Sequence, residues 1–356
     1  MNILELAGFR SNYGSNFIPT LENLDQNLTL CGHNTFYIFS NENLSDGFYD
    51  WEIPFSQKHS TTLVNFHSVA FIKEISRFIR KNKIDIVHAH FCSSIYLSQI
   101  KKLSPKNVAF YQQMHTIPFN NEIGRKAWLK RVRNVFTFDK NITVICISEA
   151  MVPIVKYIFP RNNVVTCINC IDFSRFEKRN YNRNEKFSVL LFGYNYYVKG
   201  VDVAIKAVLK VKKIISGIHL DIVMGDNLEE NTNRIEREFG AVPECVSILR
   251  PTNNIKPYYQ NHAVFLNASR SEGGSYAILE AYYSGALCVL SDVPATREAN
   301  LPNVILFKNE DPDSLAEALI EAHRVKDTYE NNADYVEGKY SIDTWSKNIM
   351  RILKIH

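Results

Sequence analysis

The stretch A-V-F-L-N-A-S-R-S-E-G-G-S-Y-A-I-L-E-A-Y-Y-S-G-A-L-C-V-L-S-D, residues 263–292, carries the clearest structural signal in the chain. It starts with a short apolar run, turns at two consecutive glycines, continues as a helical segment that stops before Gly285, and ends in a second apolar run. Apolar runs that alternate with helical segments are typical of parallel strands covered by helices. The stretch therefore predicts one strand–helix–strand unit of a parallel α/β sheet.

The same alternation extends through most of the chain. Strands are expected at residues 2–7, 35–40, 85–89, 108–112, 141–147, 164–168, 187–192, 220–224, 246–249, 263–267, 288–291 and 304–307. Helices are expected at residues 69–81, 201–214, 276–284 and 313–324. The strand segments are rich in Val, Ile and Phe and apolar on both faces, which predicts doubly wound α/β sheets.

Length and composition indicate two domains. The 356 residues exceed one ordinary domain, and 46% hydrophobic with 22% charged residues is typical of a globular protein with a sizeable core. Residues 173–186 are rich in Arg and Asn and offer little to bury, so they are predicted to link a domain at 1–172 to a domain at 187–340. Such domains bind ligands outside the carboxyl ends of their strands, which predicts a cleft between them.

Charge is distributed unevenly between the two halves. Residues 1–184 hold 22 Lys and Arg against 14 Asp and Glu, a charge of +8, and the remainder holds 19 against 23, a charge of −4. A basic front half suits an anionic partner. The densest basic segment contains Arg125, Lys126, Lys130, Arg131 and Arg133. Trp and Leu interrupt it, so it is either a solvated helix face or a surface for anionic lipid or an anionic lipid-linked acceptor. No nucleic-acid motif accompanies it.

The N-terminal residues and the cysteines indicate a reducing compartment. Residues 1–6 carry neither a basic region nor a long apolar stretch, and no apolar run approaches 18 residues, so neither a secretory signal nor a membrane span is expected. The seven cysteines are odd in number. Cys167 and Cys170 form a C-x-x-C without a second pair at zinc spacing, which favours a structural role. A cytoplasmic protein is therefore expected, with the inner face of the membrane as a further candidate location.

The segment from Glu272 to Glu280 is suited to binding a phosphorylated sugar. Gly273, Gly274, Ser275 and Tyr276 lie at the start of the predicted helix, where backbone N–H groups and the helix dipole attract phosphate. Glu272 precedes the turn and Glu280 lies two turns into the helix, so both can face one crevice. A carboxylate there can accept hydrogen bonds from sugar or ribose hydroxyls. Glu280 is unusual on an otherwise apolar helix, which favours a functional role over a packing role.

These residues resemble the E-x7-E motif of the glycosyltransferase family four enzymes, group 1 type, which are retaining and have the two-domain GT-B fold. The resemblance covers nearly the whole chain. D-I-V-H-A-H at 85–90, Q-M-H-T-I-P at 113–118, I-S-E-A at 147–150, I-N-C-I-D-F-S-R-F at 168–176 and F-G-Y-N-Y-Y-V-K-G at 192–200 are similar to motifs of this family. Thr344 and Trp345 begin a segment, within 341–356, that resembles the final helix crossing back to the first domain.

The resemblance assigns roles to single residues. His115 stands at the position of the active-site histidine and is expected to be catalytic together with Glu272. Lys199 corresponds to a diphosphate-binding lysine, while Tyr194 occupies the place of the usual arginine and is a further candidate for donor contact. Gly14 matches the glycine loop of the first domain. Cys170 replaces a glycine that the family carries.

The resemblance implies a hexosyltransferase of polysaccharide biosynthesis that moves a hexose or N-acetylhexosamine from a nucleotide sugar, UDP by default, to a hydroxyl of a glycan, lipid-linked or protein acceptor. Lys199 and the helix start can neutralise the leaving diphosphate, so no metal or other cofactor is expected. Two alternatives stay open: a nucleotide-sugar 2-epimerase of the same fold, and a non-catalytic partner subunit of a glycosyltransferase complex. The departures at Tyr194 and Cys170 keep the second alternative open.

Two other patterns resemble metal sites. Asp311 and Asp313 form an Asp-x-Asp, but they precede a helix with an intervening proline and are expected to cap it. His88 and His90 lie two apart on a strand and face the same side. Because no neighbouring carboxylate or cysteine is evident in the sequence, strand-end packing is the expected role of this pair.

Overall fold

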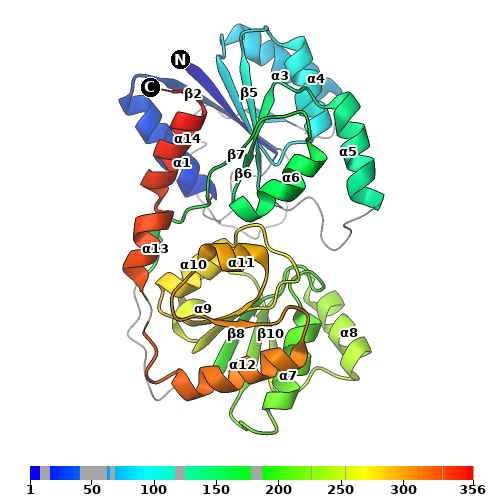
Figure 1. The fold of residues 1–356 in the computed structure, drawn as a ribbon, viewed down its shortest axis with the longest axis vertical. Helices are drawn as coiled ribbons and strands as arrows, with labels where there is room; N and C mark the ends of the chain where they lie inside the picture. The colour runs from blue at the N-terminus through cyan, green and yellow to red at the C-terminus, as the bar shows by residue number, and fades with distance from the viewer. Residues whose placement is uncertain are drawn as a thin grey trace. The chain divides into compact units, whose positions relative to one another are not determined.

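A computed structural model describes residues 1–8, 17–40, 62–64, 69–116, 125–177, 187–225, 227–252, 254–330 and 332–355. The chain divides into two compact units (Figure 1). Unit 1 comprises Met1–Asp172 together with Ile342–His356, and unit 2 comprises Phe173–Ser341. Gly14 and residues 178–186 of the predicted linker lie outside the described residues.

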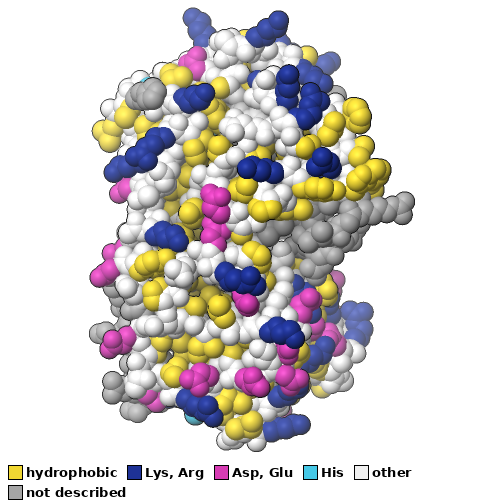
Figure 2. Space-filling model, viewed as in Figure 1, with side chains coloured by type: hydrophobic (Ala, Val, Ile, Leu, Met, Phe, Trp, Pro, Cys, Tyr) yellow, Lys and Arg dark blue, Asp and Glu magenta, His cyan; other side chains and the backbone are white. Residues whose placement is uncertain are grey.

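The surface carries charged side chains of both signs with hydrophobic side chains between them on the face shown in Figure 2. Within the described part of the chain, no helix combines the length and the apolar character that crossing a membrane requires.

Unit 1 is built on a seven-stranded parallel sheet with the order β3-β2-β1-β4-β5-β6-β7. Its strands are β1 (Asn2–Ala7), β2 (Asn34–Ser40), β3 (Thr62–Val64), β4 (Ile86–His90), β5 (Ala109–Met114), β6 (Ile142–Cys146) and β7 (Val164–Thr166). Its helices are α1 (Phe17–Leu30), α3 (Val69–Lys81), α4 (Ser94–Leu103), α5 (Arg125–Thr137), α6 (Val152–Ile158) and α14 (Ile342–Ile352), with a 3₁₀ turn at Glu149–Met151. The order reverses direction beside β1, as in doubly wound sheets.

Alternate residues of the central strands pack into different layers. Leu4 and Leu6 of β1 and Val87 of β4 join one buried cluster with α3 and α4, whereas Ile3 and Ile86 join another with α1 and α14. Because side chains alternate across a strand, Glu5 lies on the same face as Ile3. Both faces of this sheet are therefore covered by helices.

The last helix belongs to unit 1. Trp345 of α14 is 4% exposed and packs in the cluster that contains Ile3. Asn23 of α1 donates to the Asp343 carboxylate at 2.8 Å and accepts from the Ser346 hydroxyl at 2.6 Å. The C-terminal segment thus completes the layer that α1 begins.

Unit 2 is built on a six-stranded parallel sheet with the order β10-β9-β8-β11-β12-β13. Its strands are β8 (Ser188–Phe192), β9 (His219–Val223), β10 (Val246–Leu249), β11 (Val264–Asn267), β12 (Leu287–Ser291) and β13 (Ile305–Phe307). Its helices are α7 (Val201–Val211), α8 (Leu228–Phe239), α9 (Lys256–Gln260), α10 (Tyr276–Tyr283), α11 (Pro294–Ala299), α12 (Pro312–Val325) and α13 (Ala333–Tyr340), with a 3₁₀ turn at Phe173–Arg175.

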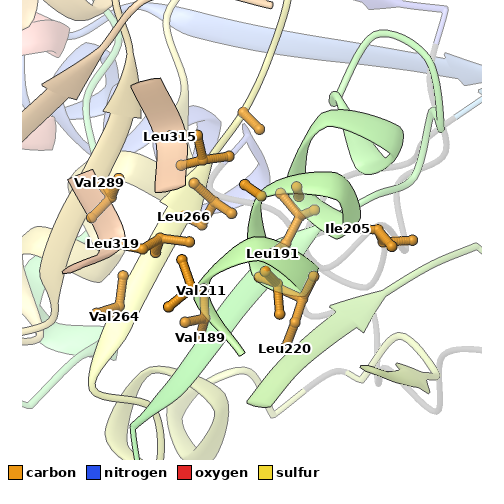
Figure 3. Packing of buried hydrophobic residues seen from close by; sticks show 14 of the residues in the cluster. Val189, Leu191, Ile205, Val211, Leu220, Val264, Leu266, Val289, Leu315 and Leu319 are labelled. Atoms are coloured by element: carbon orange, nitrogen blue, oxygen red, sulfur yellow. The ribbon is translucent and has the colours of Figure 1, made fainter. Parts of the chain in front are cut away.

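The core of unit 2 fills one face of its sheet. Val189 and Leu191 of β8 lie beside Val264 of β11 and pack against Val211 of α7 and Leu319 of α12 (Figure 3). All five side chains are at most 1% exposed. On the opposite face, Phe192, Phe265 and Tyr259 form an aromatic cluster with ring centroids 5.6–5.9 Å apart.

The predicted strands are all present, with small shifts at their ends, and the parallel α/β prediction is confirmed. The helix predicted at 69–81 matches α3, and the one predicted at 201–214 ends earlier, at Val211. One edge strand, β3, was not predicted, because three residues are too short to show an alternation.

The backbone at Gly200 leaves no room for a side chain. It caps α7 with φ +65°, and a Cβ atom there would lie 2.1 Å from the Ala268 carbonyl oxygen. We expect Gly200→Ala to lower the free energy of unfolding of unit 2 by at least about 2 kcal/mol, because left-handed backbone strain and a backbone clash add. Urea denaturation monitored by fluorescence measures the change. Gly217→Ala is the control, since a Cβ atom at Gly217 meets nothing within 4 Å; equal midpoints for the two variants would contradict the prediction.

Candidate functional site

The connection between β11 and α10 is a rigid loop. The Ser291 hydroxyl donates to the Ser269 carbonyl at 2.7 Å, and the Arg270 N–H donates to the Val198 carbonyl at 2.8 Å. Gly274 has φ +149°, a conformation that side-chain-bearing residues rarely adopt. Ser275 occupies the N-cap of α10 without capping the helix through its side chain. The loop therefore presents the positive end of the α10 dipole without a capping hydroxyl.

Lys199 and Glu272, which the sequence analysis assigned to one site, lie in contact. Lys199 Nζ donates to Glu272 Oε2 at 3.0 Å, and the side-chain amide of Asn267 lies 3.4 Å from the same oxygen. Lys199 precedes α7 and Glu272 precedes α10, so the two helix starts lie close together. Both side chains are partly exposed, at 25% and 12%. A partly exposed ion pair adds little stability, so it can open to admit an anionic ligand at small cost.

Glu280 projects from α10 toward a buried tyrosine. The Tyr259 hydroxyl donates to Glu280 Oε2 at 2.7 Å, and Tyr259 is fully buried. Burial and the nearby Glu280 carboxylate raise the pKa of Tyr259 well above its usual range, so the phenol stays protonated and donates. Tyr194 stands next to Phe192, whose ring contacts Tyr259. Tyr194, which is exposed, and Glu280 therefore both lie beside the aromatic cluster of Phe192, Phe265 and Tyr259.

Arg270 holds the two loops of this site together. Its guanidinium binds both carboxylate oxygens of Asp202 at 2.8 and 2.7 Å and Glu310 at 2.6 Å, and lies 4.1 Å from the centroid of the Tyr197 ring. Although burial alone would raise the pKa of Asp202, the Arg270 hydrogen bonds and charge lower it. Arg270 is thus committed to ion pairs, and it does not take the role of the arginine that Tyr194 replaces.

Arg270 and Tyr259 were not predicted from the sequence as members of this site. Arg270 lies two residues before Glu272 and could have been noticed as a charge beside the glycine turn. Its partner Asp202 is 68 residues away, which no local pattern reveals. Tyr259 lies in the short helix α9 and carries no motif.

Unit 1 contains a buried histidine cluster around Glu5. Strands β1 and β4 pair so that Glu5 stands opposite His88. Glu5 Oε2 lies 3.0 Å from His88 Nδ1 and 2.8 Å from His90 Nε2, and His90 Nδ1 lies 3.0 Å from His115 Nε2. The expectation that no carboxylate accompanies His88 and His90 is therefore wrong. Glu5 was not predicted because it lies 83 residues from His88 in the sequence. A charged residue inside an otherwise apolar strand could have indicated a buried charged partner.

Electrostatics define the protonation of this cluster. Burial alone would raise the pKa of Glu5, but the charges and hydrogen bonds of His88 and His90 lower it to about 2. Burial, together with the charge of His88, lowers the pKa of His90 to about 4. Burial and the neighbouring histidines lower the pKa of His115 well below its usual range. At neutral pH Glu5 is a carboxylate, and His90 and His115 are uncharged.

Glu5, His88 and His90 are also the described group that could hold a metal ion, with one ligand atom each within 4.8 Å of the others. In the structure these atoms are hydrogen-bonded to one another rather than directed at an open position. Asp311 caps α12 by accepting from the N–H groups of Asp313 and Ser314, and the Asp313 carboxylate pairs with Lys210. The capping role predicted for Asp311 is confirmed.

The basic helix α5 exposes both charge and apolar surface. Trp128, Leu129 and Phe136 are 54%, 50% and 81% exposed, and Arg133 is exposed beside them. Hydrophobic and basic side chains are mixed over the region of α5 in Figure 2. Lys130 is half-buried, and the side chains of Arg125 and Lys126 lie outside the described residues.

Arg131 has a structural role in the same region. It donates to the Tyr157 carbonyl at 2.9 Å and lies over the Tyr157 ring, and so ties α5 to α6. The two cysteines of the C-x-x-C are buried free thiols, and burial raises the pKa of Cys167 to about 12. Cys170 lies 3.6 Å from the Thr20 hydroxyl. Both thiols therefore stay protonated inside unit 1.

The match to a protein family falls within unit 2. Residues 186–324 match the family model Glycosyl transferases group 1. A curated relative, an uncharacterised glycosyltransferase of Haemophilus influenzae, is 24% identical over 151 residues. That match covers 42% of this chain and 41% of the relative, so the chain matches less than half the length of that relative.

Solved structures match the whole chain in fold. A glycosyltransferase from Rickettsia africae superposes with a TM-score of 0.74 at 15% identity, covering 99% of this chain and 97% of that one. Anabaena Alr3699/HepE in complex with UDP-glucose superposes with a TM-score of 0.74 at 14% identity, covering 99% of both chains. The lipopolysaccharide outer core galactosyltransferase WaaB has a TM-score of 0.69 at 16% identity and 99% coverage of both chains. The chain has the GT-B fold, and its residues 186–324 are similar to the group 1 glycosyl transferases.

Proposed function

We propose that this chain is a retaining, metal-independent glycosyltransferase of the family-four type. It transfers a hexose or N-acetylhexosamine from a UDP-sugar to a hydroxyl of a glycan, lipid-linked or protein acceptor. The observation that carries the proposal is the contact between Lys199 and Glu272 at the start of α10, the helix that also holds Glu280. The match of residues 186–324 to group 1 glycosyltransferases and the UDP-glucose complex of the Anabaena protein support it.

Lys199 and the α10 dipole bind the diphosphate in this proposal. Diphosphate oxygens replace Glu272 as the partner of Lys199, because a diphosphate with two negative charges attracts the ammonium group more strongly than a single, partly solvated carboxylate does. Glu272 is then free to accept hydrogen bonds from the sugar hydroxyls. Arg270 is held by Asp202 and Glu310. Tyr194 stands at the position for which the resemblance implies an arginine, and it is a candidate for contact with the donor.

Glu280 binds the ribose, and Tyr259 fixes the carboxylate for that contact. One Glu280 oxygen accepts from Tyr259, which holds the carboxylate in one orientation. Preorganised acceptors lose less entropy when a ligand binds. A pair of ribose hydroxyls suits the remaining acceptor capacity of a carboxylate.

Transfer breaks the bond between the anomeric carbon and the phosphate oxygen and forms a bond to the acceptor oxygen on the same face of the sugar. The acceptor's hydroxyl proton passes to the leaving phosphate oxygen, so no protein base is required. Lys199 stabilises the charge that develops on the diphosphate, a role that often contributes most to catalysis. His115 is the residue of unit 1 to which the proposal gives a catalytic role.

The exposed apolar and basic side chains of α5 support an association with a membrane. Exposed Trp128 and Phe136 can enter the interface of a bilayer, and Lys130 and Arg133 can bind anionic headgroups. We propose that the protein works at the cytoplasmic face of an anionic membrane.

Nucleotide binding tests the role of Glu280. We expect Glu280→Ala to weaken UDP binding about tenfold to a hundredfold or more, because a charged acceptor of the ribose hydroxyls is lost. Isothermal titration calorimetry with UDP measures the affinity. Glu317→Ala, an exposed glutamate of α12, is the matched control and should bind UDP as the wild type does. Unchanged UDP affinity in Glu280→Ala would remove Glu280 from the site.

The rate of transfer tests Lys199. We expect Lys199→Ala to lower kcat about a hundredfold to a thousandfold, since it removes the cation that stabilises the leaving diphosphate. Release of UDP from UDP-glucose and UDP-N-acetylglucosamine is measured in buffer with EDTA, where the wild type should stay active. Lys210→Ala, an exposed lysine of α7, is the control. Loss of wild-type activity in EDTA would refute the metal-free mechanism, and a C2-epimerised nucleotide sugar as product would favour the epimerase alternative.

Vesicle binding tests the α5 surface. We expect the double variant Trp128→Ala, Phe136→Ala to co-sediment less with phosphatidylglycerol vesicles, because burial of each aromatic side chain in the interface contributes about 1.5–3 kcal/mol. Leu30→Ala is the control, since Leu30 is 85% exposed on α1 of the same unit. Equal co-sedimentation of both variants would show that the α5 surface does not bind the membrane.

A further inference from the structure

A continuous chain of hydrogen bonds connects Glu5 to His115 through His90. Glu5 Oε2 lies 2.8 Å from His90 Nε2, and His90 Nδ1 lies 3.0 Å from His115 Nε2. Glu5 and His90 are at most 1% exposed, whereas His115, which follows β5, is only half-buried. These hydrogen bonds thus lead from the interior of unit 1 to its surface. They end at His115, which the sequence predicts to be catalytic.

The donors and acceptors along these hydrogen bonds fix which nitrogen of each histidine carries the proton. A carboxylate only accepts, so His90 donates from Nε2 to Glu5. A neutral imidazole carries one N–H, so His90 Nδ1 has a lone pair and must accept. His115 therefore donates from Nε2, and its own lone pair lies on Nδ1. Among the described residues, no hydrogen bond engages that nitrogen.

His88 completes the cluster without joining this chain. Its Nδ1 faces the Glu5 carboxylate at 3.0 Å, and its Nε2 faces the Gln113 side-chain Oε1 at 3.0 Å. Because a carboxylate only accepts, His88 donates from Nδ1 to Glu5. Glu5 thus accepts hydrogen bonds from both His88 and His90.

The ring of His115 is also held in place by aromatic contacts. Phe91 stacks on it with centroids 4.2 Å apart and an interplanar angle of 17°, and the edge of Phe17 contacts both His90 and His115. Phe91 has φ +54°, which is a genuine outlier for a bulky residue. Backbone strain of this kind concentrates where a side chain must be placed accurately.

We propose that Glu5 and His90 are positioning residues for His115, which they hold as the Nε2–H tautomer so that its Nδ1 lone pair can accept a hydrogen bond from a sugar hydroxyl. The proposal rests on the proposed function for the identity of the ligand. The tautomer itself follows from the hydrogen bonds within unit 1. The arrangement matches the general rule that a buried carboxylate fixes the tautomer and orientation of a histidine.

Nitrogen NMR of the full-length protein with ¹⁵N-labelled histidine tests the tautomers directly. At pH 7 we expect His90 and His115 to be neutral with the proton on Nε2, with signals assigned from His90→Gln and His115→Gln. His115 found as the Nδ1–H tautomer or as imidazolium would overturn the proposal. Stoichiometric zinc on the purified protein, coordinated by this cluster, would also overturn it. Neither outcome depends on glycosyl transfer.

The isosteric variant Glu5→Gln tests the role of the carboxylate. An amide can donate as well as accept, so it permits the reversed chain in which His90 donates from Nδ1 to His115. We expect a mixture of His115 tautomers in this variant. We also expect kcat for UDP release from UDP-sugar to fall about tenfold to a hundredfold, with UDP affinity unchanged because the nucleotide residues lie in unit 2.

The variant His88→Gln separates positioning from packing. It alters the same buried carboxylate but leaves the bond between Glu5 and His90, so His115 should keep the Nε2–H tautomer. Equal disturbance of His115 in both variants would show that the cluster only packs. Wild-type protein that neither binds UDP nor transfers a sugar would refute the proposed function, while the NMR result would still decide the tautomer.

Discussion

A sheet whose strands are all parallel requires the chain to return from its carboxyl edge to its amino edge between each pair of strands. In both units this constraint gathers at one edge the loops that follow the strands. Lys199 follows β8 and Glu272 follows β11, and these two strands are neighbours. His90 ends β4 and His115 follows β5, and these strands are also neighbours. The pairing of strands thus brings residues distant in sequence into hydrogen-bond contact.

Buried charge is the second constraint, and it shapes both units in the same way. A carboxylate or guanidinium removed from water must find partners, or its burial costs several kcal/mol. Arg270 meets this requirement with Asp202 and Glu310, and by doing so it ties the loop before α10 to the first turn of α7. Glu5 meets it with His88 and His90, and by doing so it orders the histidines. In each case the partner that satisfies the charge also positions a candidate functional residue.

Unit 2 is similar to known proteins in both sequence and fold, whereas unit 1 is similar to them in fold. The family match covers residues 186–324, which lie within unit 2, and there the E-x7-E spacing is set by one turn and one helix. Unit 1 is matched through its fold, at sequence identities of 14–16%. A fold hosts many activities, so the chemistry of unit 1 has to be argued from its own side chains. The cluster of Glu5, His90 and His115 supplies that argument.

The sequence alone determined the features that depend on local spacing. Alternating apolar runs and helical segments predicted the parallel sheets, and the acidic and glycine residues between 272 and 280 predicted the helix start and the placement of Glu272 and Glu280 around it. Asp311 was recognisable as a helix cap because a cap depends on the next three residues. The three-residue strand β3 escaped because it is too short to show a period.

Only the tertiary structure decided which distant residues meet. Arg270 with Asp202, Tyr259 with Glu280, and Glu5 with the two histidines are pairs separated by 21 to 85 residues. Their contacts depend on the order of strands in the sheet and on which face each side chain takes. A strand sequence shows the alternation of faces but not the neighbour across the sheet, because the hydrogen bonds that choose the neighbour are made by the backbone and are the same for every sequence.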